Sequence, residues 1–202
     1  MHMKVRLVDC VGYLIPGAAG HMEDGRARMV STPWSDEKIP FEQAAEKGTE
    51  KVIRDHSTVG IVITTDGSIG TMTRESYLKA EERVIEQLSQ LGKPFVVILN
   101  TVRPRSSQTA DICREMMKTY KVPVIAADCA RLSGEELDEI MGMLLQRFPV
   151  REVIFQLPGY VEGLGTDHWL KSGLIANIKH WAENFNDAGD VIATAEDLAD
   201  GQ

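Results

Sequence analysis

The sequence predicts an α/β fold in which a doubly wound, mostly parallel sheet is covered by helices on both faces. Three strand-then-helix units follow one another between residues 60 and 148, an order typical of parallel sheets. The strand runs are short and apolar throughout, as in VVIL at 96–99, which indicates burial on both faces. Each helical segment carries apolar residues three or four positions apart, and so presents one apolar stripe to a sheet.

The chain opens with an apolar run at residues 5–8 that predicts a first strand and leads directly into the turn at residues 9–12. Residues 13–40 are rich in glycine, proline and charge without a sustained period, which predicts a long loop or lid. The spacing of apolar residues over 41–56 predicts a helix, although Gly48 weakens its interior.

The three central units share one plan, in which a short apolar strand is followed by a polar turn and a helix with one apolar face. Gly92 and Pro94 end the first of these helices. Serines precede the other two as candidate N-caps. The expected strands are 60–64, 95–99 and 124–127, and the expected helices are 74–91, 106–120 and 134–148.

The pattern changes after Pro149. Residues 153–157 predict an edge strand, residues 167–184 a helix, and residues 187–202 a frayed end. We therefore interpret residues 1–150 as one α/β domain. Residues 151–202, with the edge strand, the helix and the frayed segment, are interpreted as the start of the next region.

Composition excludes several classes of protein. The 202 residues are 43% hydrophobic, enough for a substantial core and too much for a disordered chain. The net charge of -8 comes from acids spread along the chain, which argues against a nucleic-acid partner. No apolar run approaches the roughly 20 residues that cross a bilayer, and the first residues lack a secretory signal. We therefore expect a cytoplasmic protein.

Polar groups that end strands are the candidate site residues, because ligands of open parallel sheets bind beyond the carboxyl ends of the strands. Asp9 and Gly12 form a DxxG turn directly after the first expected strand. In nucleotide hydrolases an aspartate at this place holds Mg²⁺, and a glycine lets a backbone N–H approach the γ-phosphate. Asp-x-x-Gly also makes an ordinary turn, so both interpretations remain open.

Two further strand ends carry candidate residues. Thr65 and Asp66, in TTDG, place a hydroxyl and a carboxylate where a phosphate or metal could bind, but Asp-Gly is also a common turn. Asn100, in LNTVRP, stands where base-reading nucleotide hydrolases often carry Asn-Lys-x-Asp. Arg103 occupies the place of the aspartate that pairs with guanine, so guanine specificity is not expected. Asn100 alone could instead cap the end of its strand.

Several strings together resemble the stage IV sporulation protein A family over roughly residues 4 to 185: VRLVDCVGY, STPW, IPFEQAAEKGT, HSTVGIVITTDGSIG, AEERVIEQL, GKPFVVILNTVRP and DHWL. The resemblance implies a P-loop ATPase of the translation-factor class. Its members use ATP hydrolysis to polymerise into the basement layer of the spore coat, on the mother-cell side of the outer forespore membrane.

The resemblance also implies roles for single residues, with ATP and Mg²⁺ as cofactors. Asp9 matches the magnesium aspartate of Walker B and Gly12 the γ-phosphate contact, while Thr65 and Asp66 are carried over as further candidates. The family's first strand, GxxxxGK[ST] loop and switch threonines would precede Met1, and the sequence contains no substitute. We therefore expect this chain alone to hydrolyse ATP weakly or not at all.

The partners implied by the resemblance are further copies of the protein, spore coat proteins and a small amphipathic membrane peptide, stage V sporulation protein M. A missing first strand would leave a sheet edge that invites dimerisation. Two alternatives remain open: a non-catalytic α/β scaffold for self-association, and a phosphoacceptor or flavodoxin-like domain with Asp9 and Asp66 as its acids. The nucleotide hypothesis requires the Asp9 carboxylate to end a strand and point into a phosphate-sized crevice.

Overall fold

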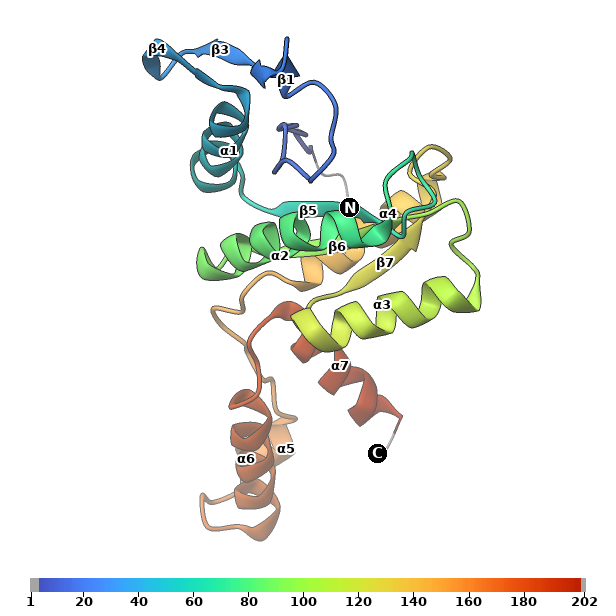
Figure 1. Ribbon diagram of the computed structural model, residues 1–202. Helices are drawn as coiled ribbons and strands as arrows, with labels where there is room; N and C mark the ends of the chain where they lie inside the picture. The colour runs from blue at the N-terminus through green and yellow to red at the C-terminus, as the bar shows by residue number, and fades with distance from the viewer. Residues whose placement is uncertain (1–3, 201–202) are drawn as a thin grey trace. The chain divides into compact units, whose positions relative to one another are not determined.

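The computed structural model describes residues 4–200, which divide into two compact units. The first unit extends to Ile140 and contains a parallel sheet with its helices (Figure 1). The second unit begins at Met141, and its regular structure is helical. Helix α4 (Gly134–Gln146) carries the chain from one unit into the other.

The first unit is built on a three-stranded parallel sheet with the order β5-β6-β7. Strand β5 (Gly60–Thr65) pairs with β6 (Phe95–Asn100), and β6 pairs with β7 (Val124–Ala127). The three strands confirm the sequence predictions to within one residue. An α/β architecture follows from their alternation with helices.

Strand β6 forms the centre of the core. Val96, Val97 and Leu99 have no exposed surface, and Ile98 is only 4% exposed. Successive strand residues point to opposite faces of a sheet, so this continuous burial means that both faces of β6 are covered. Each such side chain contributes about 1.5–3 kcal/mol by leaving water, which explains why an unbroken apolar run forms the central strand.

Two helices connect the strands of the sheet, as predicted. Helix α2 (Arg74–Gln90) joins β5 to β6, and Gly92 follows it with a φ of 62° that suits glycine. Helix α3 (Ser107–Tyr120) joins β6 to β7. The hydroxyl of Ser106 accepts the Thr109 N–H at 3.1 Å, so the expected N-cap is present.

The expected first strand at residues 5–8 is wrong, because these residues have no ladder partner. Val5 is 52% exposed and Leu7 83% exposed. A run of β-forming residues becomes a strand only beside another strand. A cavity, described below, separates the end of this run from β5.

The expected loop over residues 13–40 contains four short strands that form two antiparallel hairpins. They are β1 (Met22–Glu23), β2 (Arg26–Ala27), β3 (Met29–Thr32) and β4 (Ser35–Pro40). Asp24 and Gly25 join the first pair with φ angles of 50° and 74°, as a two-residue hairpin turn requires. The expected helix at 41–56 is confirmed as α1 (Phe41–Lys51), continued by the π-helical segment η1 (Val52–His56).

The second unit contains α5 (Gly159–Glu162), α6 (Trp169–Ala182) and α7 (Ala188–Ala199). Helix α6 confirms the helix expected at 167–184. The expected edge strand at 153–157 is wrong, since these residues have no ladder partner, and Phe155 instead stacks on Phe185 with ring centroids 6.5 Å apart. The frayed end expected at residues 187–202 is also wrong, because a capping box starts helix α7. Residues 201–202 lie outside the described chain.

Candidate functional site

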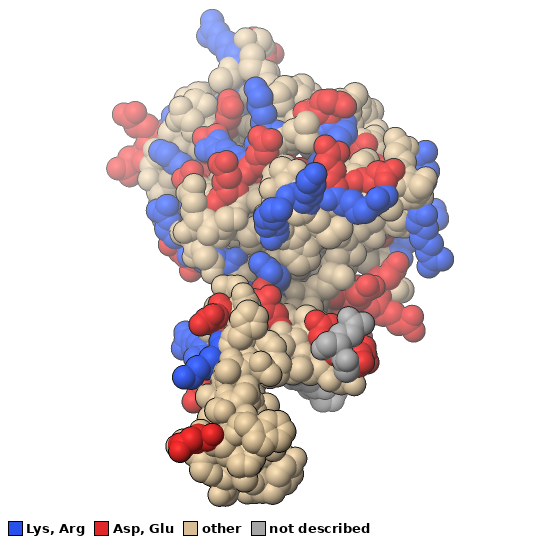
Figure 2. Space-filling view, turned by 90° about the horizontal axis from the view of Figure 1, so that it is seen from below, with Lys and Arg blue, Asp and Glu red and all other residues tan. Residues whose placement is uncertain are grey.

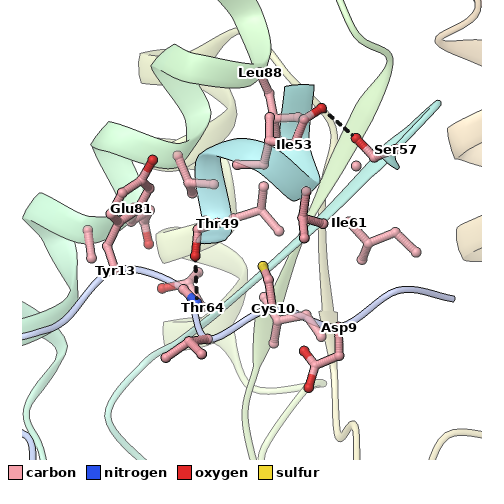
Figure 3. A pocket seen from close by; sticks show the side chains of 18 of the residues that line it. Asp9, Cys10, Tyr13, Thr49, Ile53, Ser57, Ile61, Thr64, Glu81 and Leu88 are labelled. Carbon is pink, nitrogen blue, oxygen red and sulfur yellow. Dashed lines mark hydrogen bonds between the residues drawn. The ribbon is translucent and has the colours of Figure 1, made fainter. Parts of the chain in front are cut away.

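A cavity of about 450 Å³ lies between strand β5 and the segment of residues 8–13 (Figure 3). We call it the β5 groove. Its two long walls are this segment and residues 60–64 of β5, and it is closed by side chains from α1, η1 and α2. Most of its lining is apolar, including Ile53, Ile61, Val84 and Leu88, with Thr49 and Glu81 among the polar exceptions.

Asp9 and Gly12 both line the β5 groove. The Asp9 carboxylate is exposed, and it makes no hydrogen bond or ion pair with another described residue. In Figure 3 it points away from the apolar side chains of Ile53 and Leu88. A free carboxylate is a suitable oxygen ligand for Mg²⁺, directly or through water. Residues 5–8 form no strand, however, so Asp9 does not end a strand as the nucleotide hypothesis requires.

Gly12 has a φ of 78°, a conformation that favours glycine. Its backbone N–H donates to the Thr49 hydroxyl at 3.1 Å, and Thr49 is only 2% exposed. The amide expected at a γ-phosphate is therefore bound to helix α1 in this structure.

Tyr13 anchors the same segment to helix α2. Its hydroxyl donates to the Gln87 side chain, and the Arg83 guanidinium lies 4.1 Å above its ring. Burial raises the pKa of Tyr13, which keeps the hydroxyl protonated as a donor. Arg83 also pairs with Glu46 and lies 3.7 Å from Glu50, so α1, α2 and the segment are joined in one network.

Asp66 closes the turn after β5. Its carboxylate accepts the Ser68 N–H at 2.9 Å, the Ser68 hydroxyl at 2.5 Å and the Thr101 hydroxyl at 2.7 Å. Burial alone would raise the pKa of Asp66, but these hydrogen bonds together hold it below its ordinary value. Thr65 contributes to the same turn by accepting the Gly67 N–H at 3.1 Å.

Asn100 connects the ends of β6 and β7. Its side-chain oxygen accepts the Cys129 N–H at 3.0 Å. Thr101, the next residue, binds Asp66, so the carboxyl ends of all three strands are cross-linked by side chains. Burial raises the pKa of the Cys129 thiol, which makes it a poor nucleophile.

The structure divides the predicted site residues into two groups. Asp9 and Gly12 lie together on the wall of the β5 groove. Thr65, Asp66 and Asn100 lie at the carboxyl ends of β5 and β6, and none of the three lines the groove. The first group leaves a carboxylate free for a ligand, whereas Asp66 and Asn100 already bind within the protein.

The sequence analysis missed a buried ion pair beside the groove. Arg74 holds the Glu81 carboxylate through two contacts of 2.5 and 2.8 Å, and donates to the Thr64 hydroxyl at 2.9 Å. Tyr120 donates to the same carboxylate at 2.8 Å, and the Glu81 side chain is 1% exposed. Burial is the main cause that raises the pKa of Tyr120, and the hydrogen bond to Glu81 raises it further. The only sequence signal is an arginine and a glutamate seven positions apart on one helix face.

Charge on the surface is mixed. On the face that Figure 2 presents, Lys and Arg are interspersed with Asp and Glu and do not gather into a basic patch. Among the described residues, no three His, Cys, Asp or Glu side chains cluster as they would around a metal ion. None of the helices in the described part of the chain has the length and apolar character needed to cross a membrane.

Comparison with known proteins decides the family. The ATPase domain of stage IV sporulation protein A matches residues 1–149. The chain belongs to this family. The stage IV sporulation protein A of Clostridioides difficile (strain 630) is 50% identical over 177 residues, which cover 88% of this chain and 36% of that protein. The stage IV sporulation protein A of Bacillus subtilis (strain 168) is 42% identical over 191 residues, which cover 95% of this chain and 39% of that protein.

The resemblance drawn from the sequence strings is thereby confirmed. The Bacillus anthracis stage IV sporulation protein A is also 42% identical over 191 residues. The chain spans less than two fifths of the length of these relatives. Among solved structures, none matches the chain significantly. Asp9, Gly12, Thr65, Asp66 and Asn100 all lie within the part that matches the stage IV sporulation protein A ATPase domain.

Proposed function

We propose that this chain is the ATP-binding and ATP-hydrolysing domain of a sporulation protein that polymerises into the basement layer of the spore coat. The observation that carries the proposal is the free Asp9 carboxylate on the wall of the β5 groove, two residues before the Val11-Gly12 turn. It lies within the part of the chain that matches an ATPase domain. Asp9 would hold Mg²⁺, whose positive charge would offset the negative charge of the phosphate groups.

Asp9 would hold and orient that metal, directly or through a water molecule. Gly12 would donate its backbone N–H to a phosphate oxygen, and for this the N–H must leave the Thr49 hydroxyl. The glycine backbone is free to turn in this way, because an added Cβ would meet no atom within 4 Å and no side chain restricts φ. Thr49 therefore competes with the ligand for the Gly12 amide.

The chain lacks one part of a complete phosphate site. Its 202 residues contain no GxxxxGK[ST] string, and therefore no phosphate-binding lysine of that kind. Such a loop supplies backbone N–H groups and a positive charge at the β- and γ-phosphates. We propose that this chain alone hydrolyses ATP weakly or not at all, and that the native full-length protein supplies the missing groups.

The proposal includes partners and a location. ATP turnover would drive self-association into a polymer on the mother-cell side of the outer forespore membrane. Spore coat proteins and the small amphipathic membrane peptide, stage V sporulation protein M, would bind there. These assignments rest on membership of the family.

A calorimetric titration with ATP·Mg²⁺ tests the proposal. We expect the native full-length protein to bind ATP·Mg²⁺. Asp9→Ala should weaken binding by at least about tenfold and slow hydrolysis by about 100-fold, the cost of losing one preorganised charge contact. Asp36→Ala changes an exposed aspartate on β4 and is the matched control, which should behave as the unchanged protein. Binding and turnover that are equal in Asp9→Ala and the unchanged protein would refute the role of Asp9.

A second function is a non-catalytic α/β scaffold for self-association. It is favoured by the polar groups of Gly12, Asp66 and Asn100, each of which already binds a partner inside the chain. The same titration separates the two functions. Absence of heat from the unchanged full-length protein and from Asp9→Ala would support the scaffold.

A further inference from the structure

Helix α2 holds Tyr13 at two places. The Tyr13 hydroxyl donates to the Gln87 side chain, and the Arg83 guanidinium lies 4.1 Å from the centre of the Tyr13 ring. A cation over the face of an aromatic ring is attracted by it. Arg83 and Gln87 are four positions apart in α2, so they lie on one face of the helix. Because Tyr13 directly follows Gly12, the turn that carries the candidate site residues is fixed to α2.

Arg83 also contacts helix α1. Its guanidinium pairs with Glu46 and lies 3.7 Å from Glu50. The Arg83 side chain is 44% exposed, and an ion pair this exposed adds little to the stability of a fold. The same guanidinium lies over the Tyr13 ring. The two carboxylates therefore restrict where the guanidinium can lie, and they keep it over the ring.

The turn at residues 9–12 has one anchor that a ligand can replace and one that it leaves in place. The Gly12 N–H donates to Thr49 at 3.1 Å, and a bound phosphate would compete for it. A flip of this peptide changes the φ of Gly12 and, in compensation, the ψ of the residue before it, so the chain on either side keeps its place. Tyr13 therefore stays bound to α2 while the amide turns. The Asp9 carboxylate is exposed, so its position depends on the backbone that Tyr13 anchors.

We propose that Arg83 is a positioning residue for ATP hydrolysis: by holding the Tyr13 ring against α2, its guanidinium fixes the turn that presents Asp9 and Gly12 to the nucleotide. This inference rests on the proposed function. A turn that leaves its place would still meet Mg²⁺ and phosphate, but it would orient them less well in the transition state, where small displacements slow a reaction strongly. Loss of Arg83 should therefore lower kcat more than it raises KM.

Steady-state ATP hydrolysis by the native full-length protein tests the inference. Arg83→Gln removes the charge and should lower kcat about tenfold, while KM changes by less than about threefold. Arg83→Lys keeps a cation for the ring and should recover much of the loss. Arg114→Gln is the matched control, at an exposed arginine of α3 that pairs with Asp111, and it should leave both constants unchanged. A Lys variant as slow as Arg83→Gln, or a Gln variant as fast as the control, overturns the inference.

Substitutions at Tyr13 separate the role of its ring from that of its hydroxyl. Tyr13→Phe loses the contact with Gln87 but keeps the ring beneath the guanidinium, so it should retain most of the turnover. Tyr13→Leu loses both contacts and should resemble Arg83→Gln. Because the two residues act through one contact, the double variant should be no slower than either single variant. If the losses in kcat multiply in the double variant, or if Tyr13→Phe is as slow as Tyr13→Leu, the inference is overturned.

A charge swap separates the hold on Tyr13 from the bridge between α1 and α2. Glu46→Arg combined with Arg83→Glu restores an ion pair between the two helices, but it places a carboxylate instead of a cation at the Tyr13 ring. The inference predicts a kcat as low as that of Arg83→Gln. Turnover that the swap restores overturns the inference and leaves the proposed function intact. If the unchanged full-length protein does not hydrolyse ATP, the proposed function fails and the inference fails with it.

Discussion

The backbone N–H of Gly12 donates to the buried hydroxyl of Thr49, 37 positions further along the chain, at 3.1 Å. This contact fixes the segment that carries Asp9 to helix α1. It also sets one wall of the β5 groove, because Gly12 and Thr49 both line that cavity. The position of the candidate metal ligand therefore depends on a hydroxyl in another element.

Thr49→Val should release this segment. The substitution keeps the shape of the side chain but removes the acceptor, and the loss of one buried hydrogen bond costs about 1 kcal/mol of unfolding free energy. Amide exchange at Gly12 should become faster, while Thr49→Ser, which retains the hydroxyl, should stay close to the unchanged protein. Equal exchange at Gly12 in the valine and serine variants would show that the contact does not hold the segment.

Asp66→Asn should lower stability in a way that depends on pH. The hydrogen bonds from Ser68 and Thr101 hold the folded pKa of Asp66 below its ordinary value of 3.8. A carboxyl with a depressed folded pKa stabilises the fold fully above its unfolded pKa, and the contribution is lost as the pH falls through the folded pKa. Because Asp66 is partly exposed, we expect a loss of only about 1 kcal/mol at pH 7.

Urea unfolding of both proteins between pH 7 and pH 3 measures this effect. The difference in unfolding free energy between Asp66→Asn and the unchanged chain should be constant down to about pH 4 and shrink below it. Glu75→Gln, at an exposed carboxyl whose pKa is also lowered by hydrogen bonds, is the control and should change stability much less. A difference that grows on acidification would contradict the assignment.

The buried pair of Arg74 and Glu81 should respond differently to single and double substitution. Arg74→Met leaves the Glu81 carboxylate buried without its partner, which costs about 3–5 kcal/mol. Replacing both residues by Met removes both charges and should recover much of that loss. Tyr120→Phe removes one hydrogen bond to Glu81 and should cost about 1 kcal/mol. A double-mutant cycle from chemical unfolding measures the coupling free energy between Arg74 and Glu81. If the losses from the two single substitutions simply add in the double variant, the coupling is absent.

Helix α7 should depend on its N-cap. The Asp187 carboxylate accepts the Asp190 N–H at 3.1 Å and pairs with Arg147 at 2.5 Å. Asp187→Ala should destabilise this helix by about 1–2 kcal/mol, seen as faster amide exchange over residues 188–199. Asp197→Ala removes an exposed acid near the end of the same helix and should have no effect or a slightly stabilising one. If the two variants exchange alike, the capping role is wrong.

The sheet could be predicted from the sequence because its strands are apolar on both faces. Burial of that kind leaves a local signature, which the run from Val96 to Leu99 carries in consecutive residues. Residues 5–8 carry a similar propensity, but a strand also needs a neighbour, and the neighbour is set by tertiary structure. The hairpin at Asp24 and Gly25 does carry a local signal, because Asp-Gly is a common two-residue hairpin turn. The prediction of a loop over residues 13–40 left this signal out.

The candidate site could be predicted only in part. Asp9 and Gly12 stand in one short turn, so the sequence placed them together. The contact of Gly12 with Thr49 and that of Asp66 with Thr101 join residues 37 and 35 positions apart, and no local pattern reports such pairs. The burial of Glu81 was hidden for a similar reason, because its partners come from the start of its own helix and from α3.

Calorimetric titration of the native full-length protein with ATP·Mg²⁺, with and without Asp9→Ala, measures most directly whether the carboxylate on the groove wall serves nucleotide chemistry. The account predicts saturable binding that weakens at least about tenfold in the variant, a change of about 1.4 kcal/mol. Identical affinity in the two proteins, with both folded as judged by circular dichroism, would contradict it.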